Sequence, residues 1–182
     1  TLEVFFEDKK LGGYYMTSHD HEKLLAREKP AYDGAEPSGN SIQALNLLRL
    51  NKFTTKDHYR KRATELFKFV ANILNTSPMA LSELLLALDY YLTSAKEILV
   101  LLPANIKFED TDLAPIIRSS FIPHKIISIV NQGSDQKELE KIIPLFKEKI
   151  IFDKKATAYI CQDGICKLPT TKANILKVQL AL

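Results

Sequence analysis

The chain has 182 residues, of which 46% are hydrophobic and 26% are charged, and its formal net charge is +3. This balance excludes a disordered chain, and the length suffices for one domain or for one domain with a small second lobe. The positive charges form no dense basic stripe, and the longest apolar runs fall far short of the ~20 residues of a membrane span, so we expect neither nucleic acid nor membrane as a partner.

The first segment, Thr1–Glu7, is already apolar and fits the last turns of a helix. A chain that begins in mid-pattern favours a larger helical protein of which this is a part. Gly12-Gly13 ends the segment, and Tyr14–Met16 is a short extended stretch. Residues 17–40 then form a long polar connection, which is uncommon in a compact domain and often functional. No signal-peptide pattern is present, so we expect a cytoplasmic protein.

Three helices are predicted to follow this connection. The first begins near Ser38–Ser41 and ends near Leu50, the second spans residues 56–74, and the third spans residues 78–92. Apolar residues surround most of the first and third helices, whereas the second has a single apolar stripe. The alternation of buried and amphipathic helices predicts two concentric layers.

The pattern changes to short apolar runs of strand length after Lys96. The runs at 98–102 and 126–130 are each followed by a helical pattern, which predicts a parallel strand pair with a right-handed crossover. Residues 157–168 predict a hairpin around Asp163-Gly164, the strongest turn signal in the chain. The sequence therefore predicts a mixed α and β fold that is mainly α.

Two helices of this second region carry local signals. The helix predicted over residues 112–121 begins at Asp112, a residue type that favours the N-cap position. The helix predicted over residues 135–148 contains Pro144, which should kink or split it. A last helix is predicted over residues 172–180.

The polar run from Asp33 to Ser41 is the best candidate for a functional site. Ser38, Asn40 and Ser41 can cap a helix whose first N–H groups need acceptors. Asp33 and Glu36 supply carboxylates for acid–base catalysis or for holding sugar hydroxyls, and the positive end of a buried helix suits an anionic or hydroxyl-rich ligand. The alternative, which the chemistry alone favours, is a capped helix start followed by a surface turn.

Tyr14 and Tyr15 could place aromatic faces beside a ligand, as sugar pockets often require, or could be ordinary core residues. His19 and His21 alternate with acidic residues and supply metal-ligand types, but their spacing favours a solvated loop. We therefore predict no metal and no cofactor.

Cys161 and Cys166 flank the predicted hairpin turn. A two-residue turn makes Gln162 and Ile165 the first pair, and the cysteines then form the next, non-hydrogen-bonded pair, in which side chains are close. A disulfide is geometrically feasible there, although two reduced thiols are the simpler expectation. The spacing is not that of a Cys-x-x-Cys redox motif, and zinc would need ligands that the local sequence lacks.

Several motifs together resemble one family. They are Gly12–Tyr15, Arg27, Asp33–Ser41, Ala44–Leu50, Ala158–Cys161, Cys166 and Pro169–Thr171. Over essentially its whole length, the chain resembles the C-terminal part of the thioredoxin-domain-containing proteins that include bacterial YyaL-like proteins and the spermatogenesis-associated protein of animals. Such proteins carry an N-terminal thioredoxin-like domain and then an (α/α) toroid of the six-hairpin glycosidase type, similar to sugar epimerases.

The resemblance implies helices of a partial (α/α) toroid over residues 1–95, including the loop 17–40. A small α/β lobe with a parallel strand pair and a C-terminal β-hairpin would occupy residues 96–182. The implied function is that of a C-terminal part of a carbohydrate-processing, epimerase- or glycosidase-like protein, inactive alone because a toroid site needs groups from several helices. No position matches the catalytic histidines of epimerases, so His58 and His124 are expected at the surface.

Two other functions remain open. The chain could be a non-catalytic module that packs on the remaining helices of a larger protein or self-associates through exposed apolar faces. It could also be a thiol redox partner of a thioredoxin-like domain, through Cys161 and Cys166.

Overall fold

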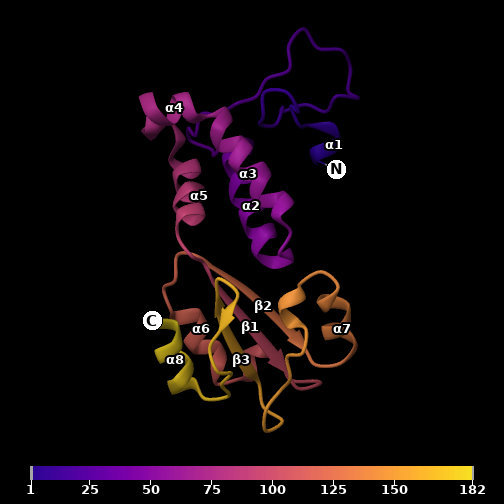
Figure 1. Ribbon diagram of the computed structural model, residues 1–182, viewed down its shortest axis with the longest axis vertical. Coiled ribbons are helices and arrows are strands. Elements are labelled where there is room, and N and C mark those ends of the chain that lie inside the picture. The colour runs from indigo at the N-terminus through magenta and orange to yellow at the C-terminus, as the bar shows by residue number, and fades with distance from the viewer. Residues whose placement is uncertain (1, 182) are drawn as a thin grey trace. The chain divides into compact units, whose positions relative to one another are not determined.

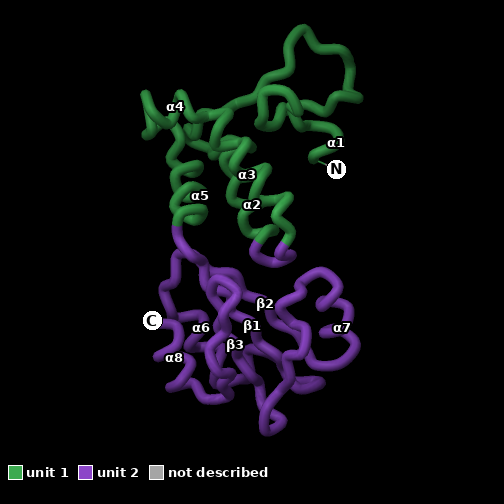
Figure 2. Tube along the Cα trace, in the orientation of Figure 1, with its two compact units in different colours: residues 1–51, 56–92 green, residues 52–55, 93–182 purple. Residues whose placement is uncertain are grey.

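A computed structural model of the chain describes residues 2–181. The chain divides into two compact units (Figure 2). Unit 1 comprises the residues up to Asn51 and Lys56–Leu92, whereas unit 2 comprises Lys52–Thr55 and the residues from Thr93 onward. The fold is mixed α and β and mainly α, as the sequence predicts.

Unit 1 is helical (Figure 1). Its elements are α1 (Leu2–Phe5), α2 (Gly39–Thr54), α3 (Asp57–Phe69), α4 (Ala71–Thr76), the 3-10 helix η1 (Pro78–Leu81) and α5 (Ser82–Leu92), the last residues of α2 counting with unit 2. Residues 17–38 contain no helix or strand, which confirms the predicted long connection.

The helices α2 and α5 each bury one stripe rather than their whole circumference. Leu47 and Leu48 of α2 are buried, but Ile42 is 40% exposed, and Leu86 of α5 is 57% exposed. The expectation that these helices are buried on nearly all sides is therefore wrong for this chain. Two concentric layers remain a prediction.

The second predicted helix is broken at Val70. Its backbone there has φ −97° and ψ 4°, so α3 ends and α4 starts as a separate helix. Pro78 then opens the 3-10 turn η1, where its missing N–H costs nothing, and α5 begins at Ser82.

Unit 2 is built around a four-stranded mixed sheet. Its strands are β1 (Lys96–Leu102), β2 (Lys125–Asn131), β3 (Thr157–Gln162) and β4 (Ile165–Cys166), in the order β2-β1-β3-β4. β1 and β2 are parallel, and β3 runs antiparallel to both β1 and β4. The predicted parallel pair and the predicted hairpin are both confirmed.

Helices cover both faces of this sheet (Figure 1). They are α6 (Leu113–Ser119), α7 (Ser134–Glu140) and α8 (Ala173–Ala181), with the 3-10 helices η2 (Phe108–Asp110) and η3 (Pro144–Phe146). Ile98 and Val100 of β1 share one core cluster with α6 and α8, whereas Leu99 and Leu101 share another with η3. Successive residues of a strand point to opposite faces, so β1 serves both cores.

Two local predictions in unit 2 have different outcomes. Pro144 does split the later helix, since α7 ends at Glu140 and η3 starts at the proline. Asp112 makes no capping hydrogen bond with its side chain, because its own backbone is already helical, with φ −63° and ψ −14°. None of the helices in the described range 2–181 combines the length and the apolar character that crossing a membrane requires.

Candidate functional site

The carboxylate of Asp33 is buried and accepts hydrogen bonds from four donors. Its Oδ1 accepts the backbone N–H of Ser38 at 2.8 Å, and its Oδ2 accepts the Ser41 hydroxyl at 2.9 Å. Oδ2 also accepts the N–H groups of Glu83 and Leu84, in the first turn of α5, at 3.0 and 3.1 Å. Burial raises the pKa of Asp33, but the hydrogen bonds outweigh it and hold the pKa below its ordinary value.

Ser38 caps the start of α2, as the sequence predicts, whereas Ser41 does not act as a cap but is the residue whose N–H is capped. The Ser38 Oγ accepts the N–H of Ser41 at 3.1 Å and lies 2.9 Å from the Ser41 Oγ. Because the Ser41 hydroxyl donates to Asp33, the Ser38 hydroxyl must be the donor to Ser41. Both hydroxyls are therefore used within the fold.

Asn40 joins the first turn of α2 to two distant backbone segments. Its Oδ1 accepts the N–H of Tyr14 at 2.7 Å, and its Nδ2 donates to the carbonyls of Tyr14 and Pro30, each at 2.9 Å. The side chain is 2% exposed. All three polar contacts are internal, so Asn40 fixes the backbone beside Tyr14.

The two tyrosines have different environments. Tyr14 is 7% exposed, its hydroxyl accepts the Nε–H of Arg62 at 3.3 Å, and burial raises its pKa. The Tyr15 hydroxyl donates to Asp8 at 2.9 Å, which raises the pKa of Tyr15. The guanidinium of Arg27 lies 4.0 Å from the Tyr15 ring centroid, so it covers one face of that ring.

A pocket of about 330 Å³ lies at the start of α2. It is lined by Leu2, Phe6, Tyr14, Tyr15, Met16, Pro30, Gly39, Asn40 and Gln43. Of the predicted site residues, it brings together Tyr14, Tyr15 and Asn40. Asp33, Ser38 and Ser41 lie outside this lining, and Glu36 is exposed. The wall is mainly apolar and aromatic with a few polar groups, a composition that is typical of small-molecule sites, although the amide of Asn40 is already used by the backbone.

Asp8 forms a second polar centre that the sequence reasoning missed. Its carboxylate accepts Lys29 Nζ at 2.7 Å and the N–H groups of Lys10 and Leu11 at 3.0 and 3.1 Å. These contacts, with Lys29 first, hold the pKa of Asp8 far below its ordinary value. An Asp four residues before Gly12 is a turn signal that could have pointed to it.

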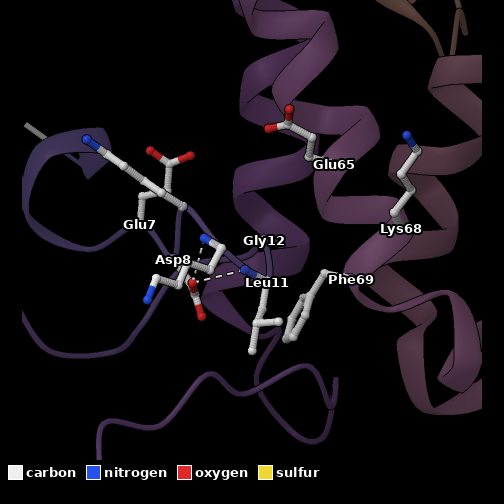
Figure 3. A pocket seen from close by; sticks show the side chains of 9 residues that line it. Glu7, Asp8, Leu11, Gly12, Glu65, Lys68 and Phe69 are labelled. Atoms are coloured by element: carbon white, nitrogen blue, oxygen red, sulfur yellow. Dashed lines mark hydrogen bonds between the residues drawn. The ribbon is translucent and has the colours of Figure 1, made fainter.

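Figure 3 shows a second pocket, of about 320 Å³, around this turn. Glu65, Lys68 and Phe69 of α3 form one side, and the Asp8 turn forms the other. Charged groups of both signs line it, and the acidic ones near the turn are already paired, Asp8 with Lys29 and Glu7 with Arg62. Its charges therefore favour no single class of ligand.

Three of the four histidines are exposed. His19 and His21 are exposed, and the His19 ring packs on Phe5 with 5.4 Å between ring centroids. His58 is exposed and lies 2.9 Å from Glu3, while His124 is half-buried. Within residues 2–181, no three His, Cys, Asp or Glu side chains gather in a way that could hold a metal ion.

Cys161 and Cys166 are joined by a disulfide, so the simpler expectation of two reduced thiols is wrong. They are paired in the β3–β4 hairpin in the register that the turn predicts. Glu97, the residue opposite Cys161 on β1, is 4% exposed. The sequence reasoning missed it, although a lone charge inside an apolar strand is a signal for an unusual site.

The chain is similar to spermatogenesis-associated protein 20 of Homo sapiens, with 31% identity over 94% of the chain and 22% of that protein. The protein of the same name from Mus musculus is 29% identical over the same shares, and an uncharacterised protein of Caenorhabditis elegans is 30% identical over 86% of the chain and 21% of its own length. The chain thus spans about a fifth of these relatives. No family model matches it.

Proposed function

We propose that the chain is the C-terminal part of a protein of the spermatogenesis-associated protein 20 type, and that it supplies one wall of a carbohydrate-binding site. The similarity over 94% of the chain supports the first statement. In this proposal, the whole protein folds as an (α/α) toroid behind a thioredoxin-like domain, and it lies in the cytoplasm. The carbohydrate chemistry rests on that fold-level analogy and on the pocket at the start of α2.

The observation that carries the ligand-binding proposal is the pocket beside Tyr14, Tyr15 and Asn40. Sugars bind to aromatic and apolar walls through their C–H faces and to amide groups through their hydroxyls. Phe6 and Met16 supply further apolar wall, and Gln43 supplies an amide. A neutral sugar suits this lining better than an anionic one, since none of its side chains carries a charge.

Binding is better supported than catalysis for this chain. Four donors already occupy the Asp33 carboxylate, and its lowered pKa removes it as a general acid near neutral pH. We assign Asp33 the role of holding the start of α2 in place. Glu36 is exposed and contributes nothing to the pocket wall. The groups that act on a sugar would come from other parts of the whole protein.

The test is a titration of the chain with neutral mono- and disaccharides, monitored by NMR through the backbone amide resonances of Tyr15 and Gln43. We expect saturable shifts for at least one sugar. Met16→Ala removes pocket wall and should weaken binding about fivefold, the effect of losing roughly 1 kcal/mol. Met79→Ala is the matched control, because Met79 is 84% exposed and outside the pocket. Shifts with no sugar, or equal affinity in the two variants, would contradict the proposal.

A further inference from the structure

The disulfide of unit 2 joins one fully buried cysteine to one that is partly exposed. Cys161 is fully buried on β3, whereas Cys166 is partly exposed on β4, the edge strand of the sheet. The neighbouring Ile165 and Leu168 are 78% and 84% exposed. An incoming thiol can therefore approach Cys166 from solvent, and the sulfur that departs is Cys161.

Glu97 lies on the same side of the sheet as the departing sulfur. It is the register partner of Cys161 in the antiparallel pair of β1 and β3, and facing residues in such a pair project from the same face. The Glu97 Oε2 is buried and has no hydrogen-bond partner among the described residues. The Oε1 lies 3.6 Å from Lys52 Nζ.

Two charged groups act on Glu97. Burial raises its pKa, Lys52 from the end of α2 opposes that rise, and Asp163 from the β3–β4 turn adds to it. The side chain can therefore hold a proton at a higher pH than an ordinary glutamate. A carboxyl that can carry a proton and has one oxygen without a hydrogen-bond partner is the kind of group that a departing thiolate needs.

Backbone pairing closes the hairpin alongside the disulfide. The two cysteines are only five residues apart, and a cross-link over so short a loop removes less entropy from the unfolded chain than one over a long loop. The pairs Gln162–Ile165 and Ala158–Thr170 hold the same segment through the backbone. A role other than holding the hairpin closed therefore explains the disulfide better.

We propose that Cys161–Cys166 is a thiol–disulfide exchange site for a dithiol partner, with Cys166 as the attacked sulfur and Glu97 as the acid that protonates Cys161. A thiolate of the dithiol attacks the Cys166 sulfur, the bond between the cysteines breaks, and the electron pair leaves on Cys161. Glu97 gives its proton to that thiolate. The second thiol of the dithiol then attacks the dithiol sulfur that is bound to Cys166 and displaces the Cys166 sulfur. The dithiol is thereby oxidised to a disulfide, and the cysteine pair is reduced to two thiols.

The first experiment measures reduction of the chain by dithiothreitol between pH 5 and 9, with alkylation and mass spectrometry as the readout. The rate constant per reductant thiolate should fall as pH rises through the pKa of Glu97. The pH at which this fall occurs is a bend in the pH–rate profile. Glu97→Gln should lower the rate constant about tenfold or more at acidic pH and remove the bend. Glu109→Gln, which alters an exposed carboxylate of the same unit, should leave both unchanged. A wild-type rate and profile in Glu97→Gln would overturn the proposal.

Two further variants keep Glu97 in place and test its titration if Glu97→Gln does not fold. Lys52→Met should move the bend to higher pH, because Lys52 lowers the pKa of Glu97, and Asp163→Asn should move it to lower pH. Asparagine also tolerates the positive φ of 51° at residue 163. If the bend stayed at the same pH in both variants, the proposed role of Glu97 as the acid would be contradicted.

A last comparison identifies the attacked sulfur. The Cys166 thiol in Cys161→Ser should react with Ellman's reagent at least about tenfold faster than the Cys161 thiol in Cys166→Ser, because thiol reactivity follows access and thiolate character. Faster reaction of Cys161 would reverse the assignment and overturn the proposed order of steps.

Discussion

The Asp33 carboxylate connects three parts of unit 1: its own loop, the start of α2 and the first turn of α5. In the α5 contact it accepts two N–H groups, those of Glu83 and Leu84, that a helix start leaves without partners. A carboxylate in this position also interacts favourably with the positive end of the helix. Its removal would leave several buried donors unpaired at once.

We therefore expect Asp33→Ala to destabilise unit 1 by roughly 2–4 kcal/mol, the range for losing a charged cap and its buried partners. Chemical denaturation followed by circular dichroism measures this. Glu36→Ala, three residues along the same loop, is exposed and should change stability by less than about 0.5 kcal/mol. Equal effects of the two substitutions would show that Asp33 is not an anchor.

The sequence predicts part of this network. Ser38 stands where a cap is needed at the start of α2, so its role follows from its residue type and position. The contact from Asp33 to Leu84 joins residues 51 positions apart, and no local pattern encodes it. The ionised, fully bonded state of Asp33 depends on that contact, which explains why sequence reasoning treated it as a candidate acid or base.

At the scale of elements, the segment before α2 is held by a close approach of Gly13 to α3. A Cβ at Gly13 would lie 2.7 Å from the Phe69 ring, and its φ of +75° disfavours any side chain. Gly39, the first residue of α2, has open space around its Cβ position. Alanine substitutions at Gly13 and Gly39 can therefore be compared as test and control.

Gly13→Ala should lower the free energy of unfolding of unit 1 by roughly 2 kcal/mol or more, because strain and a clash add up. Gly39→Ala should be neutral or stabilising by up to about 1 kcal/mol, since alanine restricts the unfolded chain. Thermal unfolding of both variants checks this. A Gly13→Ala variant as stable as the wild type would mean that the 12–15 segment does not pack on α3.

Element types were more predictable than element ends. The two apolar runs of unit 2 were identified as parallel strands because helical patterns follow both of them. The break at Val70 was not predicted, because an apolar stripe continues across it with helical spacing. A single-sequence pattern does not contain the tertiary packing that can override local helix propensity.

At the scale of the whole molecule, the toroid and self-association stay predictions. Leu92 and Phe121 are 74% and 92% exposed, so each unit presents apolar surface that a larger protein or a second copy could cover. The similarity to a protein of which the chain spans only 22% is consistent with the first alternative. Sequence patterns identify such faces, but they do not identify what covers them.

The buried carboxylates give the molecule opposite pH dependences in its two units. The pKa values of Asp8 and Asp33 are lowered, so their contribution to stability is complete above about pH 4 and is lost as pH falls through their folded values. The pKa of Glu97 is raised, so its contribution is complete below about pH 4.3 and is lost as pH rises through its folded value.

Hydrogen exchange resolved by peptide between pH 3 and 8, corrected for the intrinsic pH dependence of exchange, can separate the two effects because they belong to different units. Protection of α2 in unit 1 should fall below about pH 4, and Asp33→Asn should be less protected at neutral pH with a shallower acid decline. Protection of β1 and β3 should decline above about pH 4.3 in the wild type. Glu97→Gln should remove this decline, because the neutral amide carries no charge to bury. If the protection of β1 and β3 declined with rising pH in Glu97→Gln as it does in the wild type, the buried charge of Glu97 would not be the cause of the decline.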